Sequence, residues 1–234
     1  MTGVPTTGTP RSGIPGSGTL GSGMAAVFER LAGAKVTIMG LGLHGGGVGA
    51  ARFFAGLGAQ VTVTDLRGKR ALAPSIEVLA DLDLDYVLGR HVKRSFENAD
   101  LVVANPAVAA DSPYLRAARN AGVKIESVLN FFLNLCPARV IGVTGSNGKS
   151  TTTVLLGEML RAAGVRPYVG GNLGGDILHW LPKLTPDDRV VLELSSFQLA
   201  ALDPDTPVPT TAVITNLAPN HLDRHATLDE YYGA

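Results

Sequence analysis

The chain has 234 residues and no formal net charge at pH 7, because 20 lysine and arginine residues balance 20 aspartate and glutamate residues. Hydrophobic residues (45%) and charged residues (17%) occur in the proportions of a folded globular protein, and without a basic excess we expect no nucleic-acid partner. Apolar runs stay shorter than the roughly 18 residues of a membrane helix, so we expect no membrane partner. Cys136 is the only cysteine, so we expect no intrachain disulfide and a cytoplasmic location. The chain is also expected to be a monomer, although none of these features determines the oligomeric state.

The first 23 residues differ in composition from the rest of the chain. Eighteen of them are Gly, Pro, Ser or Thr, and Arg11 is their only charged residue. Such a segment buries too little apolar surface to offset the entropy of ordering, so we predict a disordered tail over residues 1–23. Met24 opens a sequence of ordinary composition.

Residues 24–136 alternate short apolar runs with helical patterns, which predicts a Rossmann-like parallel-sheet domain. Strands are expected at 35–40, 59–65, 100–105 and 123–127, and helices at 47–58 and 112–122.

Residues 137–234 repeat this alternation and predict a second, P-loop NTPase-like α/β domain. Strands are expected at 138–145, 189–196 and 211–219, and a further helix begins near 227, so we expect this domain to be incomplete. The helix expected at 148–164 places its apolar side on six residues: Val154, Leu155, Leu156, Met159, Leu160 and Ala163.

A glycine-rich turn follows the first predicted strand. Gly40, Gly42 and Gly45 fit the G-x-G-x-x-G pattern between a strand and a helix, and Asp65 ends the next strand, where an acidic residue meets a ribose. The pattern indicates a diphosphate at a helix N-terminus, with a purely structural turn as the alternative. It does not distinguish a dinucleotide cofactor from a nucleotide sugar.

A second turn, GVTGSNGKSTT at 142–152, has the chemical groups of a P-loop with a shifted first glycine. The standard spacing would place that glycine at Val143. Gly145 and Gly148 free the backbone to approach phosphate, Lys149 supplies a positive charge, and Ser150 supplies a hydroxyl for Mg²⁺. A lysine in the first turn of a helix opposes the helix dipole, and an anion bound there would explain it.

Two further positions follow apolar strands of the second domain. Glu193 ends one strand, where P-loop proteins hold Mg²⁺, and the alternative is an ordinary glutamate at a strand end with no ligand. His221 follows another strand in NHLDRH, with Asp223, Arg224 and His225 beside it, and this clustering favours a site over a structural histidine.

The loop GVTGSNGKST resembles the ATP loop of the Mur ligases, whose form is T-G-[ST]-N-G-K-[ST]; folylpolyglutamate synthase shares it. Three segments are similar to the D-glutamate-adding branch of that family: ELSSFQL (193–199), GGNLG (170–174) and NHLDRH (220–225). The first turn followed by TDLR at 64–67 agrees, and the resemblance runs from about residue 33 to the end.

The resemblance implies an ATP- and Mg²⁺-dependent ligase of peptidoglycan synthesis, with UDP-N-acetylmuramoyl-L-alanine and D-glutamate as substrates. The substrate carboxylate would attack the γ-phosphate of ATP to give an acyl phosphate, and the amine of D-glutamate would then displace phosphate. The family's third domain and its carbamylated lysine are not in this chain, so the expectation is ligand binding without turnover.

Site residues follow from the same resemblance, position by position. Lys149 and His221 are expected to be catalytic, and Ser150, Glu193 and His221 to hold metal. ATP is expected to contact Gly145, Ser146, Asn147, Gly148, Lys149, Ser150 and Thr151. The UDP-containing substrate is expected to contact Leu43, His44, Asp65, Arg67, Asn105, Asn172 and Ser196.

The chain departs from the family pattern at three positions. His44 stands where a small hydroxyl residue is common, Asn105 where serine is expected, and Asn220 where an acidic residue is common. Three alternatives stay open: another Mur or folylpolyglutamate-type ligase, a nucleotide-binding module without turnover, and a dinucleotide-dependent oxidoreductase.

Overall fold

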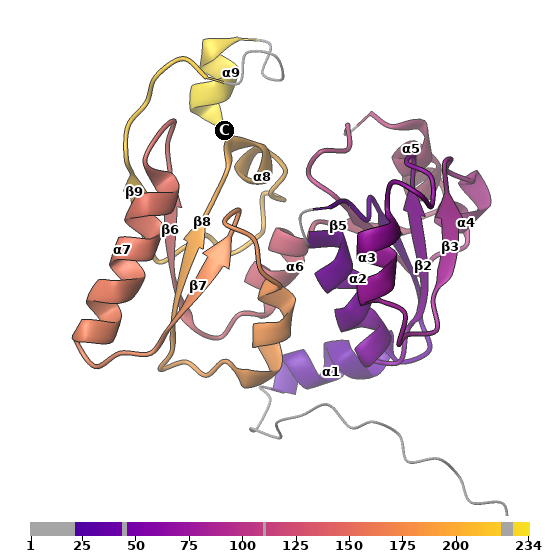
Figure 1. Cartoon of the computed structure of the whole chain (residues 1–234), viewed down its shortest axis with the longest axis horizontal. Coiled ribbons are helices and arrows are strands. Elements are labelled where there is room, and N and C mark those ends of the chain that lie inside the picture. The colour runs from indigo at the N-terminus through magenta and orange to yellow at the C-terminus, as the bar shows by residue number, and fades with distance from the viewer. Residues whose placement is uncertain (1–21, 44–45, 110, 221–226) are drawn as a thin grey trace, which may run out of the picture.

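The computed structural model describes residues 22–43, 46–109, 111–220 and 227–234 (Figure 1). The predicted tail therefore lies outside the described residues, except for Ser22 and Gly23, which open helix α1 (Ser22–Leu31). Met24 and Phe28 of α1 are buried against the first domain. Among the described residues, no helix is long and apolar enough to cross a membrane.

The first domain is built on a five-stranded parallel sheet with the order β3-β2-β1-β4-β5. Its strands are β1 (Lys35–Met39), β2 (Gln60–Asp65), β3 (Asp85–Leu88), β4 (Leu101–Ala104) and β5 (Lys124–Glu126). Its other helices are α2 (Gly46–Gly56), α3 (Ala73–Val78), α4 (Lys93–Glu97), α5 (Pro113–Asn120) and α6 (Val128–Leu135).

The central strands are buried at almost every position because helices cover both faces of a parallel sheet. Four of the five residues of β1 are buried, and the chain crosses from β1 through α2 to β2 in the manner of a βαβ unit. The sequence predicted β1, β2, β4 and β5. It gave no signal for β3, a four-residue edge strand with no fully buried position.

The second domain has a four-stranded parallel sheet with the order β7-β8-β6-β9. The strands are β6 (Arg139–Thr144), β7 (Pro167–Gly171), β8 (Arg189–Glu193) and β9 (Thr211–Ile214). The helices are α7 (Lys149–Ala162), the 3₁₀-helix η1 (Ile177–Lys183), α8 (Ser196–Ala200) and α9 (Leu228–Gly233). Two parallel-sheet α/β domains confirm the predicted fold class.

The prediction for the apolar side of α7 was wrong for four of its six residues, which are exposed. Helix α7 buries Thr153 and Gly157, whereas Leu155 and Met159 are 57% and 58% exposed. The helix approaches the sheet through small residues: a Cβ added at Gly157 would lie 2.7 Å from the Cγ2 atom of Val169 in β7. Val154, Leu155 and Met159 therefore point away from the sheet, although the pattern of hydrophobic residues had placed them on the buried side, whereas Leu156 and Leu160 are half-buried.

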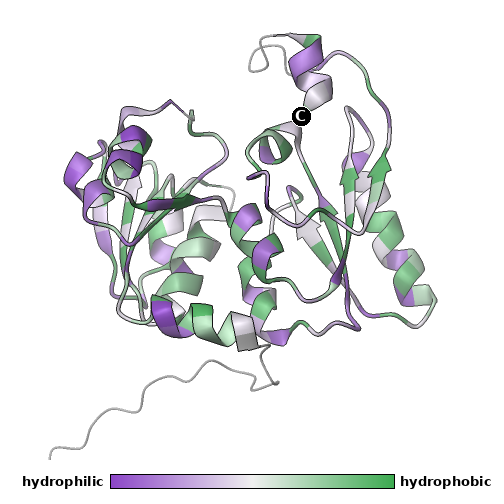
Figure 2. Ribbon diagram, turned by 180° about the vertical axis from the view of Figure 1, so that it is seen from behind, coloured by the Kyte–Doolittle hydropathy of each residue, from purple (hydrophilic) through white to green (hydrophobic). Residues whose placement is uncertain are grey.

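The two domains share one continuous hydrophobic core. Helices α2, α6 and η1 lie between the two sheets (Figure 1), and hydrophobic residues gather on these central helices (Figure 2). The rings of Phe132 in α6 and Trp180 in η1 meet edge to face, with their centroids 6.1 Å apart. Phe131 packs in the same way against Phe53 and Phe54 of α2. The predicted division at 136–137 falls directly after α6.

Candidate functional site

The P-loop joins β6 to α7 and needs glycine at two positions. Gly145 has a φ of 129°, and a Cβ there would lie 2.3 Å from the Oγ1 atom of Thr215. Gly148 has a φ of 81° and is the N-cap residue of α7. Other residues rarely adopt these backbone conformations, so the glycine pattern follows from the turn itself.

The N-terminus of α7 presents the features of an anion site. The helix has 14 residues, and its first-turn amides have no partner within the helix. The Nζ atom of Lys149 donates to the carbonyl oxygens of Gly145 (2.7 Å) and Ser146 (3.2 Å). Within the part of the chain that the structure describes, no carboxylate pairs with Lys149. The positive charge of Lys149 is therefore available to a phosphate.

A buried polar cluster stands beside this helix end. Glu193, the last residue of β8, is 3% exposed. Its Oε2 atom accepts a hydrogen bond of 2.7 Å from the hydroxyl of Ser150, and its Oε1 atom accepts one of 2.9 Å from the Nδ2 atom of Asn172. The structure thus brings together Ser150, Asn172 and Glu193, which lie 21 to 43 positions apart in the sequence.

A glycine-rich turn positions Asn172 next to Glu193. Gly171, Gly174 and Gly175 all have positive φ angles. A Cβ added at Gly171 would lie 2.4 Å from the carbonyl oxygen of Glu193, and the Asn172 amide donates to that same oxygen at 2.8 Å. The turn is therefore pressed against the end of β8, which explains the glycines of GGNLG.

Asn216 braces the P-loop, a role that the sequence did not reveal. Its carbonyl oxygen accepts from the Ser146 amide at 2.9 Å, and its side chain accepts from the Asn147 amide at 3.1 Å. The Ser146 hydroxyl is buried against Ala218 and the hydroxyl of Tyr231. The amides of Ser146 and Asn147 are thus engaged, and Lys149, Ser150 and Thr151 offer the amides that remain for phosphate. Contacts of Ser146 and Asn147 with ATP stay a prediction.

A cavity of about 330 Å³ opens beside the P-loop. Gly145, Lys149, Asn172 and Ser196 line it, and Tyr231 and Tyr232 of α9 form another wall. Ser196 is the first residue of α8, whose N-cap Ser195 forms a capping box with Gln198. Four residues predicted to contact ATP or substrate therefore share one cavity.

The first glycine turn follows β1 and is braced by side chains of its own domain. The Gly42 amide donates to the Oδ2 atom of Asp65 at 3.2 Å, and the Ser75 hydroxyl donates to the Gly42 carbonyl oxygen at 2.8 Å. The close approach of helix to turn occurs at Gly47, where a Cβ would lie 2.3 Å from the Leu41 carbonyl oxygen. Gly45, the third glycine of the sequence pattern, lies outside the described residues.

Asp65 and Arg67 form a pair at the end of β2. The Oδ1 atom of Asp65 accepts from the Arg67 amide at 2.8 Å and lies 3.4 Å from the Nε atom of Arg67. Burial favours the neutral acid, yet the hydrogen bonds from the Arg67 and Gly42 amides and the Arg67 charge outweigh burial and lower the pKa of Asp65. Asp65 is therefore an anion at neutral pH, and the half-exposed Arg67 side chain can reach a ligand.

A crevice between the domains separates the first glycine turn from the GGNLG turn of the second domain. Asn105 follows β4, next to β1, which is the point where the strand order of the first sheet reverses. A small cavity there is lined by Gly40, Gly47 and Asn105 of the first domain and by Gly171 and Gln198 of the second. Exposed Leu43 stands on the first turn. His44 and His221 lie outside the described residues, so their predicted roles stay predictions.

Two family models match the chain. Residues 34–127 match the "Mur ligase MurD-like, N-terminal domain" and residues 143–234 match the "Mur ligase middle domain". The matched ranges correspond to the two sheets described above.

Curated relatives match over most of the chain. The UDP-N-acetylmuramoylalanine--D-glutamate ligase of Roseiflexus sp. (strain RS-1) is 50% identical over 86% of this chain and 43% of its own length. The enzyme of the same name from Geotalea uraniireducens (strain Rf4) is 45% identical over 87% of this chain and 44% of its own. The chain thus spans less than half the length of these relatives.

A solved structure shares the fold. The UDP-N-acetylmuramate:L-alanyl-gamma-D-glutamyl-meso-diaminopimelate ligase of Neisseria meningitides matches with a TM-score of 0.58 at 24% identity, over 86% of this chain and 66% of that one. At this identity the likeness bears on the fold alone.

Proposed function

Because the chain belongs to the Mur ligase family, of which it carries the MurD-like N-terminal domain and the middle domain, we propose that it is the substrate- and ATP-binding part of a D-glutamate-adding ligase. The proposed reaction joins D-glutamate to UDP-N-acetylmuramoyl-L-alanine at the expense of ATP. The names of the curated relatives support the choice of substrates. They do not favour the alternative that the first glycine turn binds the dinucleotide cofactor of an oxidoreductase.

The cluster at the start of α7 is the observation that carries the proposal. Lys149 stands at a helix N-terminus with no carboxylate partner among the described residues, and Ser150 contacts a buried carboxylate, Glu193. A positive charge and oriented amides on one side, with oxygen ligands on the other, match the charges of a triphosphate and its cation.

The residues present fit a magnesium ion. Mg²⁺ prefers oxygen ligands and binds through one or two protein groups together with phosphate and water. Ser150 and Glu193 supply one hydroxyl and one carboxylate. The described part of the chain has no cluster of three or more His, Cys, Asp or Glu residues, so phosphate and water would supply the other ligands of the ion. When bound with ATP, the ion would neutralise the negative charge that develops between phosphates and carboxylate.

The chain's own residues would position the two substrates. Asp65 and Arg67 would hold the uridine end, the first turn would hold the diphosphate, and Asn172 would meet the muramoyl part in the crevice. Asn172 is already bonded to Glu193, so a substrate at Asn172 lies next to the proposed cation. Lys149 would then compensate charge as the substrate carboxylate attacks the γ-phosphate to give an acyl phosphate. The position of His221 in this step is proposed from the resemblance alone.

Binding selectivity tests the proposal and separates it from another Mur-type ligase. We expect calorimetry to show that the chain binds UDP-N-acetylmuramoyl-L-alanine more tightly than either UDP-N-acetylmuramate or a UDP-linked dipeptide, because only the first ends in the carboxylate that D-glutamate extends. NADH serves as the control for a dinucleotide site. Equal affinity for the three UDP compounds would not support UDP-N-acetylmuramoyl-L-alanine as the substrate. Tight NADH binding would contradict the proposal.

A further inference from the structure

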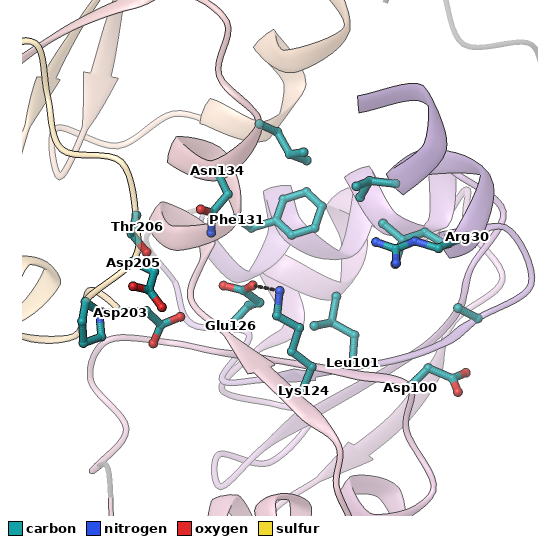
Figure 3. A pocket seen from close by; sticks show the side chains of 15 residues that line it. Arg30, Asp100, Leu101, Lys124, Glu126, Phe131, Asn134, Asp203, Asp205 and Thr206 are labelled. Atoms are coloured by element: carbon teal, nitrogen blue, oxygen red, sulfur yellow. Dashed lines mark ion pairs between the residues drawn. The ribbon is translucent and has the colours of Figure 1, made fainter. Parts of the chain in front are cut away.

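A cavity of about 780 Å³, shown in Figure 3, lies among residues of both domains. It is at the end of the first sheet where the strands begin, opposite the glycine turns. Ala34, Leu101 and Lys124 line it where β1, β4 and β5 begin, whereas both nucleotide turns follow the ends of strands. Helices α1 and α6 contribute further lining residues, and residues 203–206 of the second domain close one side. The cavity therefore lies between the two domains, where ligand sites are common, but away from the proposed active site.

Glu126 is a buried acid whose hydrogen bonding is incomplete. Its side chain is 2% exposed, and its Oε1 atom pairs with the Nζ atom of Lys124 at 2.5 Å. Its Oε2 atom is buried and has no hydrogen-bond partner among the described residues. Figure 3 shows the carboxylate among the residues that line the cavity. A buried acceptor of this kind is costly unless a donor reaches it, so the geometry calls for one.

The charges around the cavity indicate what kind of donor fits. Two cationic side chains line it, Arg30 and Lys124, against four carboxylates, those of Asp100, Glu126, Asp203 and Asp205. Within the described chain, Asp203 and Asp205 form no ion pair, and Figure 3 shows them on the same side of the cavity as Glu126. An excess of carboxylates disfavours a bound anion and favours a cation.

The remaining lining is mostly apolar, with Asn134 and Thr206 as its polar members. Leu31, Phe131 and Leu135 of α1 and α6 line the cavity together with Leu101. An aromatic face and aliphatic walls suit an alkyl chain that carries a cationic end. A single water molecule could bond to Oε2, yet the cavity has room for far more than one water.

We propose that this cavity binds a small aliphatic diamine, with an ammonium N–H donating to the Oε2 atom of Glu126 and the alkyl chain lying along Phe131 and Leu101. The second ammonium group is placed by the carboxylates of Asp203 and Asp205. Because these two aspartates belong to the second domain and Glu126 to the first, the bound diamine would hold the two domains together.

The test is calorimetric titration of the 234-residue chain with 1,5-diaminopentane, with thermal melting as a second readout. We expect saturable binding near one site per chain and a rise in the melting temperature. Glu126→Gln keeps the shape of the side chain and removes its charge, and it should weaken binding about tenfold or more. Glu97→Gln alters an exposed glutamate that does not line the cavity, so it is the matched control and should leave binding unchanged.

Two further experiments distinguish a hydrogen bond to Glu126 from non-directional attraction between opposite charges. The bis-quaternary analogue, with three methyl groups on each nitrogen, has the same charge and no N–H donor, so it should bind about as weakly as the diamine binds to Glu126→Gln. Asp205→Asn should weaken the diamine and leave pentylamine less affected. If the cavity holds only water, the diamine gives neither saturable heat nor a melting shift, and the proposal fails. Equal binding by wild type and Glu126→Gln, or by the methylated and unmethylated probes, would also overturn it.

Discussion

Gly171→Ala tests whether the glycine turn sets the position of Asn172 against Glu193. At a φ of 90° an alanine is strained, and its Cβ would lie 2.4 Å from the Glu193 carbonyl oxygen, a backbone atom that cannot move alone. Backbone strain costs about 1–3 kcal/mol and overpacking about 1–3 kcal/mol more, so we expect a loss of about 2–6 kcal/mol in the free energy of unfolding.

Gly174→Ala is the matched control because it lies in the same turn. Its φ is 99°, but its Cβ would meet no atom within 4 Å, so only the backbone strain of about 1–3 kcal/mol applies. Urea unfolding of both variants measures the difference, which isolates the clash. We also expect Gly171→Ala to weaken Mg·ATP more than Gly174→Ala does, since it displaces the end of β8. Equal losses of stability in the two variants would refute this account of the turn.

Three further outcomes are expected. Asp65→Ala should weaken the UDP-containing substrate by about 1.5–3 kcal/mol and leave ATP binding unchanged, as calorimetry can check, because one charge-assisted hydrogen bond is lost; an unchanged affinity would place the uridine elsewhere. Burial lowers the pKa of His91, so the unfolded chain binds more protons and stability falls as pH drops through about 6.5. His91→Gln should make the urea unfolding midpoint less dependent on pH between pH 7.5 and about 5.5. An unchanged pH dependence would exclude His91 as the cause of the loss of stability at low pH. Leu155→Gln should change stability by less than about 0.5 kcal/mol, because Leu155 is 57% exposed; a loss typical of a core residue would show that α7 packs through that side.

The sequence predicted elements where one local pattern was strong. The strands β1, β2, β6 and β8 were recognised because burial on both faces of a parallel sheet favours runs rich in apolar and β-branched residues. Helix α7 was recognised as a helix, but its buried face was not, since Gly157 packs through its lack of a side chain. Short elements such as β3 and α4 depend on neighbours that the local sequence does not reveal.

The candidate site shows the same division. Ser150 and Glu193 were predicted from their places at a helix start and a strand end, and they lie within hydrogen-bonding distance. The bond from Asn172 to Glu193 and the bracing by Asn216 could not be predicted, because both depend on which strands pair in the sheet. The buried Glu126 also gave no sequence signal, since its unpartnered oxygen is evident only once the surrounding helices are in place.

Lys149→Ala offers the most direct test of the central claim, which is that one domain binds ATP and the other binds the UDP-containing substrate. Calorimetry with Mg·ATP and with UDP-N-acetylmuramoyl-L-alanine should show that the variant loses ATP affinity and keeps that of the UDP compound, while the exposed control Lys93→Ala keeps both. Loss of both affinities in a folded Lys149→Ala protein, or retention of full ATP affinity, would contradict the account.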